Sequence, residues 1–220
     1  MGPLKSLSRV VFSDFDGTIT SQESFVRVLE TFAPEESRRL IPQMYDLSLP
    51  LREGVRLLLE SIESRHYPEM LDSVVRTPLR PGFESFLEFI ESRAIPFIIV
   101  TGGITAFVRA TLGPFEKRVH AIYGADLDTS GPTFRLHSDW ESGTELVSKP
   151  LVLETVRKTM PIDLPIMIGD SVTDLEMALA CSVSFARDRL ARYLDERRKP
   201  YYSYEDFEDI QRTFQEKLLT

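Results

Sequence analysis

The stretch Asp14-Phe15-Asp16-Gly17-Thr18-Ile19-Thr20 follows directly on the apolar run Val10-Val11-Phe12. The run predicts a short buried strand, and Gly17 predicts the turn that ends it. Two carboxylates two residues apart at the mouth of a strand project to the same side of the backbone. Because like charges a few ångströms apart repel unless a cation or a proton neutralises them, this stretch indicates a functional site.

Length and composition limit the kind of protein. The chain has 220 residues, of which 42% are hydrophobic and 27% charged, which is typical of an ordered globular protein. The formal net charge is −8 and no stretch concentrates basic residues, so no nucleic-acid partner is expected. Cys181 is the only cysteine, which excludes an intrachain disulfide and a cysteine metal cluster and suits a reducing cytoplasm.

The sequence contains no recognisable targeting or membrane segment. Residues 1–6 lack the apolar run that a signal peptide requires. No stretch approaches the run of about 18 apolar residues that a membrane span needs. We therefore predict a cytoplasmic protein without a membrane partner.

Residues from Glu23 to about Thr77 carry a helical pattern. Two sets of apolar residues recur at the spacing of one helix face, and several prolines divide the stretch into three or four short helices. No strand pattern occurs there, so we predict an all-helical cap over residues 21–79. The two sets are Phe25, Val28, Leu29 and Phe32, and Leu51, Val55, Leu58, Leu59 and Ile62.

The remainder, residues 1–20 and 80–220, predicts a core domain in which strands alternate with helices. Apolar runs at 96–100 and 164–168 are each followed by a polar turn and a helix, a pattern typical of parallel sheets. Residues 119–140 predict further strands, and residues 183–186 a short last strand. The predicted fold class is α/β, with a doubly wound, mostly parallel, Rossmann-like sheet and the helical cap inserted early.

Polar residues follow three of the predicted strands: Asp14 with Asp16, Thr101-Gly102-Gly103, and Asp170 with Asp174. Ligands of open α/β sheets bind beyond the carboxyl ends of the strands. Asp14 and Asp170, with a backbone carbonyl near Asp16, offer the hard oxygen ligands that suit Mg²⁺. The three sets together predict a metal-dependent site at one edge of the sheet.

A phosphate-transfer mechanism fits these groups. Asp14 would attack phosphorus, and Asp16 would protonate the leaving oxygen and then deprotonate the hydrolytic water. The Thr101 hydroxyl and the Gly102 amide, at a helix N-terminus, would hold phosphate oxygens. Lys149 is a candidate to offset the remaining negative charge, although Lys158 on the same predicted helix leaves open that Lys149 is a solvated surface residue.

This combination of motifs resembles the haloacid dehalogenase superfamily over essentially the whole chain. The resemblance implies that Asp14 is the nucleophile, Asp16 the acid/base, and Mg²⁺ the cofactor, bound by Asp14, Asp16, Asp170 and Asp174. It also implies that Thr101 and Lys149 are catalytic and that Thr101, Gly102 and Gly103 bind phosphate. The inserted helices resemble the C1-type cap, and a second acidic residue at Asp16 separates phosphatases from dehalogenases.

Within the superfamily the chain resembles the methionine-salvage phosphatases, whose substrate is 2-hydroxy-3-keto-5-methylthiopentenyl-1-phosphate. In some of those proteins the segment corresponding to residues 141–148 is rich in cysteine, whereas here it is not. Phe25, Phe32, Met44 and Tyr45 either line an apolar pocket for a methylthio group or form the core of the cap. The stretches that carry this resemblance are Thr31-Phe32-Ala33-Pro34, Arg80-Pro81-Gly82-Phe83, Asp139-Trp140, Gly169 to Asp174, and Phe185-Ala186-Arg187-Asp188.

Phosphoserine phosphatase is the alternative. In that family a Glu nine residues after the nucleophile binds the substrate amino group, which corresponds to Glu23, and a cap arginine binds the carboxylate, which Arg52 or Arg56 would do here. Glu23 is equally explained as an acidic residue in the first turn of a helix. In each case the partner is a small phosphorylated metabolite. A phosphomutase and a non-catalytic phosphate-binding protein are further alternatives.

Overall fold

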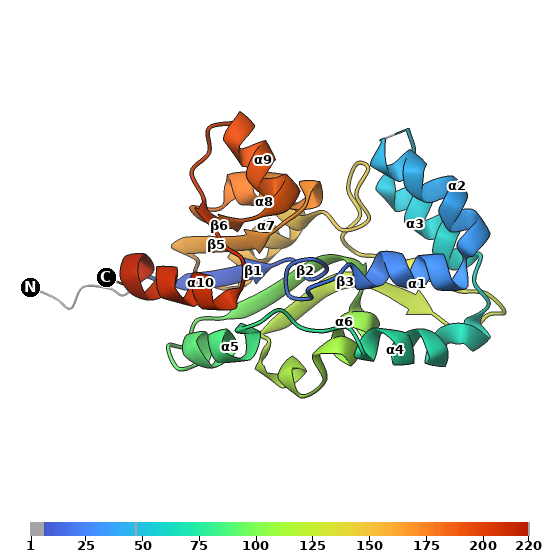
Figure 1. Cartoon of the computed structure of the whole chain (residues 1–220), viewed down its shortest axis with the longest axis horizontal. Coiled ribbons are helices and arrows are strands. Elements are labelled where there is room, and N and C mark those ends of the chain that lie inside the picture. Colours follow the sequence, from blue (N-terminus) through green and yellow to red (C-terminus); the bar gives the residue numbers. More distant parts are fainter. Residues whose placement is uncertain (1–6, 47, 220) are drawn as a thin grey trace, which may run out of the picture.

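The computed structural model describes residues 7–46 and 48–219, so residues 1–6, which the sequence predicts to hold no signal peptide, lie outside the described part. A seven-stranded sheet has the order β4-β3-β2-β1-β5-β6-β7 (Figure 1). Every neighbouring pair is parallel except β3 and β4, so the predicted mostly parallel α/β fold is confirmed. The strands are β1 (Arg9–Ser13), β2 (Phe97–Ile104), β3 (Ala121–Asp128), β4 (Arg135–His137), β5 (Leu164–Gly169), β6 (Val183–Ala186) and β7 (Tyr202–Ser203).

Strand β1 lies at the centre of the sheet, between β2 and β5. Its side chains alternate between the faces: Val10 and Phe12 belong to one apolar cluster and Val11 to the other. Both faces of the strand are therefore buried, which explains why the sequence reads as a continuous apolar run. The register pairs Ser13 with Ile99 on one side and with Ile168 on the other, so β1, β2 and β5 bring their following residues to one edge.

Helices cover both faces of the sheet, as a doubly wound fold requires (Figure 1). Helices α7, α8 and α9 supply buried side chains to the cluster that contains Phe12, and α5 and α10 supply them to the cluster that contains Val11. These helices are α5 (Phe83–Glu91), α6 (Thr105–Leu112), α7 (Lys149–Thr159), α8 (Leu175–Ala180), α9 (Asp188–Glu196) and α10 (Phe207–Thr213), with short helices η2 (Gly113–Arg118), η3 (Val172–Asp174) and η4 (Phe214–Leu218). None of the helices within residues 7–46 and 48–219 has the length and apolarity that crossing a lipid bilayer requires.

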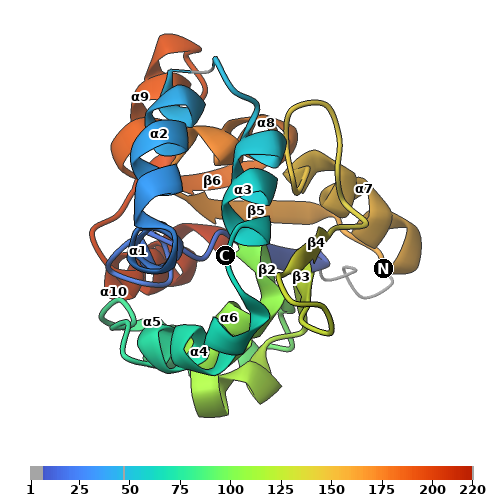
Figure 2. The ribbon, with the colours of Figure 1, turned by 90° about the vertical axis from the view of Figure 1, so that its right-hand side faces the viewer.

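The helical segment after β1 contains α1 (Ser24–Phe32), α2 (Pro34–Tyr45), α3 (Leu51–Glu60), η1 (Ser64–His66) and α4 (Tyr67–Val75). Helices α2 and α3 stand side by side away from the sheet (Figures 1 and 2). Helix α4 packs against α6, and the Thr111 hydroxyl donates to the Val74 carbonyl at 3.1 Å. The segment therefore shares an apolar core with the sheet, and its division from the core at residues 21–79 stays a prediction.

Two details differ from the sequence predictions. The predicted glycine-rich turn at 101–103 is part of β2, which continues to Ile104, so Gly102 is not at the N-terminus of α6. The strand shifts register after Val100 and pairs again with β3 at Ile104, which keeps the chain extended. The predicted tyrosine-rich link contains β7, whose Tyr202 pairs with Phe185.

Gly82 begins α5 where that helix contacts α10. Its φ is +78°, and a Cβ atom there would lie 2.8 Å from the backbone nitrogen of Glu208. We expect Gly82→Ala to lower the free energy of unfolding by about 1–3 kcal/mol, since the left-handed backbone is strained for a residue with a Cβ and the added atom would also meet the backbone of α10. Urea unfolding would measure this. Gly113→Ala is the control, because Gly113 has a φ of +53° but no heavy atom within 4 Å of its added Cβ, and an equal loss in both variants would contradict the contact with α10.

Candidate active site

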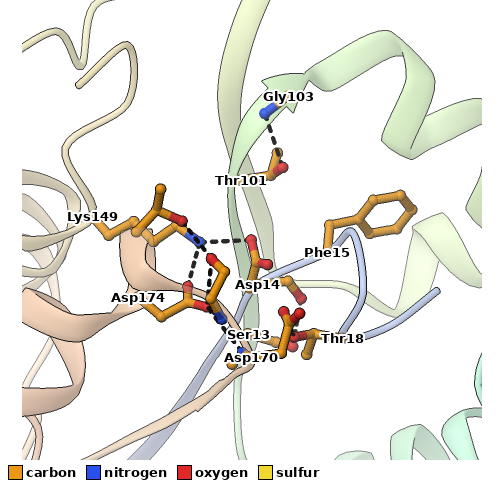
Figure 3. A network of polar contacts seen from close by, with 12 residues as sticks. Ser13, Asp14, Phe15, Thr18, Thr101, Gly103, Lys149, Asp170 and Asp174 are labelled. Atoms are coloured by element: carbon orange, nitrogen blue, oxygen red, sulfur yellow. Dashed lines mark hydrogen bonds and ion pairs between the residues drawn. The ribbon is translucent and has the colours of Figure 1, made fainter. Parts of the chain in front are cut away.

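The residues that follow β1 and β5 converge at one edge of the sheet with Thr101 and Gly103 from the last part of β2 (Figure 3). Asp14, Asp170 and Asp174 each offer a carboxylate oxygen, and these oxygens lie within 4.8 Å of one another. Lys149 contacts two of these carboxylates, with its ammonium between Asp14 and Asp174 (Figure 3). Three carboxylates and one ammonium give a formal charge of −2 when all are ionised, so the site favours a further cation or bound protons.

Lys149 is the first residue of α7, and its side chain is 1% exposed. Its Nζ donates to Oδ1 of Asp14 at 2.6 Å and to Oδ1 of Asp174 at 2.5 Å. Burial by itself lowers the pKa of Lys149, but the two carboxylates outweigh it and raise that pKa, so the ammonium stays charged. Lys149 is therefore part of a buried ion-pair network and not a solvated surface residue.

Asp174 orients the loop after β5. Its Oδ2 accepts from the backbone N–H groups of Asp170 at 3.0 Å and Ser171 at 2.9 Å, while Oδ1 faces Lys149. The carboxylate is fully buried against Gly169, where an added Cβ would lie 2.6 Å from its Cγ. With both oxygens engaged by protein donors, Asp174 holds Lys149 and the Asp170 backbone in place.

Asp14 and Asp170 are poised to bind either a cation or protons. Burial, and then the charge of Asp174, raise the pKa of Asp14 well above its usual value and that of Asp170 to about 6. The Thr18 hydroxyl donates to Oδ1 of Asp170 at 2.8 Å and partly offsets this. Hard carboxylate oxygens with surplus negative charge are the donor set that fits Mg²⁺.

Asp16 lies apart from this cluster, at the start of α1. Its Oδ1 accepts from the backbone N–H of Ser24 at 2.6 Å, from the Ser24 hydroxyl at 2.5 Å and from the N–H of Phe25 at 3.3 Å. Burial raises the pKa of Asp16, and the hydrogen bonds from Ser24 act in the opposite direction. The two carboxylates of the opening stretch therefore have separate environments, one beside Lys149 and one at a helix N-terminus.

Thr101 and Gly103 lie beside Asp16. The Thr101 Oγ1 accepts from the backbone N–H of Gly103 at 3.0 Å and is buried at the site (Figure 3). A Cβ added to Gly103 would lie 3.3 Å from Thr101 Oγ1 and 3.7 Å from Oδ2 of Asp16, so glycine keeps this space open. Gly102 is exposed, with no heavy atom within 4 Å of an added Cβ.

Glu23 lies next in the chain to Ser24, the residue that donates to the Asp16 carboxylate. The Oε2 of Glu23 accepts from the Tyr45 hydroxyl at 3.4 Å. The guanidinium of Arg189, on α9, lies 5.1 Å from the centre of the Tyr45 ring, so α2 and α9 meet across this side of the site.

Arg52, on α3, lies with its Nε 3.8 Å from Oε2 of Glu141, and Arg56 pairs with the same carboxylate. Glu141 belongs to the segment 141–148 that precedes Lys149. Arg52 thus makes an ion pair with Glu141, and its backbone N–H donates to the Thr144 carbonyl, so both of these interactions go to that segment.

The sequence predictions did not include several residues that contact the site. Ser24 is the first residue of α1, and its N–H and hydroxyl donate to Asp16 instead of capping the helix, so the rule for helix N-caps would not have identified this contact. Thr18 lay inside the opening stretch but was not assigned a contact. Arg189 was not predicted either, because it lies on α9 and no local pattern connects it with Tyr45 on α2. Tyr45 itself was predicted to line a pocket or to form the core of the cap, but it is 52% exposed and does not belong to that core.

Comparison with known families and proteins agrees with this geometry. The sequence profile of the haloacid dehalogenase-like hydrolases matches residues 11–179. A protein of Microcystis aeruginosa named 2-hydroxy-3-keto-5-methylthiopentenyl-1-phosphate phosphatase is 45% identical over 207 residues, covering 93% of this chain and 96% of the relative. A protein of the same name from Brevibacillus brevis is 30% identical over 215 residues, covering 94% and 95%.

Solved structures support the fold. A substrate-bound phosphoserine phosphatase superposes with a TM-score of 0.75 at 17% identity, covering 95% of this chain and 99% of that one. A phosphoserine phosphatase from T. onnurineus gives 0.71 at 12% identity, covering 98% and 99%. At these identities the likeness establishes the architecture and not the substrate.

The raised carboxylate pKa values predict a pH-dependent effect of metal on stability. Asp170 has a pKa of about 6 in the folded chain against an ordinary 3.8. Between these two pH values the folded state holds a proton on Asp170 that the unfolded state has lost. Without metal, its contribution to stability therefore falls as the pH rises from about 4 to about 6. Mg²⁺ replaces that proton, so we expect it to raise the midpoint of thermal unfolding more at pH 7.5 than at pH 5.

Differential scanning fluorimetry with and without Mg²⁺ measures this shift. At a free metal concentration of 100 times Kd, binding to the folded state alone stabilises it by about 2.7 kcal/mol. Asp170→Asn is the control and should lose the gain. An equal gain at both pH values, or a full gain in Asp170→Asn, would rule out metal binding at this cluster.

Proposed function

This chain belongs to the haloacid dehalogenase-like hydrolase family, and we propose that it is a Mg²⁺-dependent phosphomonoester hydrolase that forms an aspartyl-phosphate on Asp14. The observation that supports this most is the separation of the two carboxylates of the opening stretch. Asp14 contacts Lys149 within the cluster, while Asp16 contacts Ser24 outside it. Paired carboxylates in different environments can divide the roles of nucleophile and acid/base.

Asp14 is the proposed nucleophile. Its Oδ1 is held by Lys149, which leaves Oδ2 to attack phosphorus. The Lys149 ammonium lowers the pKa of Asp14, in opposition to burial, and reduces the repulsion between Asp14 and an incoming phosphate. Covalent attachment of the phosphoryl group divides the hydrolysis into two easier steps.

Asp16 is the proposed acid/base. Burial raises its pKa, which favours the protonated form that can donate to the leaving oxygen. Its Oδ2 faces the space beside Gly103 and Thr101, where we place the phosphate oxygens. After the alcohol departs, the same carboxylate would take a proton from the hydrolytic water.

Asp14, Asp170 and the main-chain carbonyl at Asp16 would hold Mg²⁺, with Asp174 orienting Lys149 and the loop of Asp170. The ion supplies positive charge that offsets the carboxylates and polarises the phosphate. The donor set supports this assignment because hard oxygens with surplus negative charge converge in one buried place.

For the substrate we propose 2-hydroxy-3-keto-5-methylthiopentenyl-1-phosphate, the compound in the names of the two relatives. Phe25 supports an apolar wall, since its ring lies next to Gly103 and 6.4 Å from the ring of Phe107. Met44 packs against Gly54 between α2 and α3, and Phe32 against His66, so these two belong to the core of the helices. We propose that the enzyme acts on this small phosphorylated metabolite in the cytoplasm.

Phosphoserine phosphatase remains the second candidate because of Glu23, which adjoins Ser24 and therefore the Asp16 carboxylate. The position of Arg52 favours the first candidate. A carboxylate-binding arginine has to be available to the substrate, whereas Arg52 and Arg56 both pair with Glu141.

Turnover of the two phosphate esters side by side tests the substrate assignment. We expect kcat/KM for 2-hydroxy-3-keto-5-methylthiopentenyl-1-phosphate to exceed that for phosphoserine by about 100-fold or more, the scale of discrimination when a buried site leaves the wrong ligand's polar groups unpaired. Asp14→Asn, measured in parallel, sets the background, and its activity should be lost with both compounds. A preference for phosphoserine would overturn the substrate and leave the mechanism in place.

A further inference from the structure

Arg80 lies where the chain returns from the helical segment to α5. It is 9% exposed, and in the part of the chain that the structure describes its guanidinium bonds to main-chain carbonyl groups. Its own backbone N–H donates to the Ile19 carbonyl at 2.7 Å, and Leu79 forms a bridge with Thr20. The side chain therefore starts from the point where the outgoing and returning links of the helical segment run together.

Three of the carbonyl groups belong to the stretch that carries Asp16. The Arg80 Nε donates to the Thr18 carbonyl at 2.8 Å, and Nη2 donates to the carbonyls of Gly17 and, at 3.3 Å, Thr20. A guanidinium is the one side chain with five donors in a fixed plane, which allows it to serve several acceptors together.

The stretch from Phe15 to Thr20 behaves as one turn. The Phe15 carbonyl accepts from the backbone N–H groups of Ile19 at 2.8 Å and Thr20 at 3.0 Å. As at the end of a helix, carbonyl groups in the turn need donors from elsewhere, and the Arg80 guanidinium supplies one to each of the carbonyls of Gly17, Thr18 and Thr20. Asp16 lies inside this turn, next to Gly17, so the aim of its carboxylate depends on how the turn is held.

The Arg80 guanidinium also bonds to the C-terminal segment around Glu205, which lies beyond the residues that match the family profile. Nη1 of Arg80 donates to the Glu205 carbonyl at 3.2 Å, and Nη1 of Arg187 donates to the same oxygen at 3.0 Å. Nearby, the Phe207 N–H donates to the Pro81 carbonyl and the Tyr204 hydroxyl to the Gly169 carbonyl. Helix α10 packs against α5 (Figure 1). The C-terminal segment is therefore bonded to the turn after β1 through Arg80 and to the end of β5 through Tyr204.

We propose that Arg80 is a positioning residue that fixes the direction of the Asp16 carboxylate by clamping the turn of residues 15–20 to the C-terminal segment at Glu205. The proposal rests on the proposed function, because it takes Asp16 as the acid. In that step an Asp14 oxygen forms a bond to phosphorus, the bond from phosphorus to the leaving oxygen breaks, and the proton of Asp16 goes to that oxygen.

Loss of the clamp should weaken proton delivery more than phosphoryl transfer itself. A phenol of low pKa leaves as the anion without a proton, whereas a phenol of high pKa requires one. A substituted phenyl phosphate series therefore separates acid positioning from general damage. The value of kcat/KM is the quantity to compare, because it reports the steps up to the first irreversible departure of the leaving group.

The experiment compares wild type, Arg80→Gln and Arg80→Lys on 4-nitrophenyl, phenyl and 4-methylphenyl phosphate. Loss of the whole general acid typically costs about 10²–10⁴-fold, so we expect Arg80→Gln to lower kcat/KM for 4-methylphenyl phosphate about 10-fold more than for 4-nitrophenyl phosphate. Arg80→Lys keeps the charge with fewer donors and should lie between the two, and it provides the same comparison if Arg80→Gln does not fold.

Arg93→Gln is the matched control, because the hydrogen bonds of that guanidinium within the described residues go to the Phe89 carbonyl and the Ser92 hydroxyl, neither of which belongs to the turn. It should leave the ratio between the phosphates unchanged. Equal factors of loss for all three phosphates, or no loss, in the Arg80 variants would overturn the role of Arg80. Wild-type protein that hydrolyses none of them would contradict the proposed function, and the role of Arg80 with it.

Discussion

The structure depends on one buried cation. Lys149 joins Asp14, at the end of β1, to Asp174, after β5, and so connects two strand ends and the first turn of α7. Removing one partner of a buried ion pair costs about 3–5 kcal/mol, because the remaining charge stays buried without compensation. The network is nevertheless short of positive charge, and this deficit favours a divalent ion, whose charge would in turn allow an anionic substrate to approach the carboxylates.

The rest of the fold places groups around that cation. Parallel strands bring Asp14, Thr101 and Asp170 to one edge, since Asp14 follows β1, Asp170 follows β5, and Thr101 lies in the last part of the neighbouring β2. The helical segment contributes Ser24, which holds Asp16 away from the cluster and so gives the second carboxylate its own environment. Arg80 lies where the chain returns from this segment to the core, and its guanidinium donates to the carbonyl of Thr18 in the turn that carries Asp16.

Much of this was predictable from sequence because the signals were local. Apolar runs ending in Asp or Gly identified the strands and the edge of the sheet, and the motif spacing identified Asp14, Asp16 and Asp170. Lys149 could not be distinguished from Lys158 by pattern, because only the position of α7 against the strand ends buries the first of them. Strand β7 has two residues and therefore no run to detect. The pairing of Arg52 with Glu141 and the clamp of Arg80 arise between distant segments, where sequence alone carries no geometric information.

The central claim is that Asp14 carries the phosphoryl group during turnover, and mass spectrometry of acid-quenched enzyme tests it directly. Peptides containing residues 14–20 from wild-type enzyme, quenched while hydrolysing substrate with Mg²⁺, should gain the mass of one phosphoryl group at Asp14. Reduction with borohydride should convert that residue to homoserine, and Asp14→Asn should show neither change. Steady hydrolysis without any phosphorylated Asp14, or phosphorylation at another residue, would contradict the account.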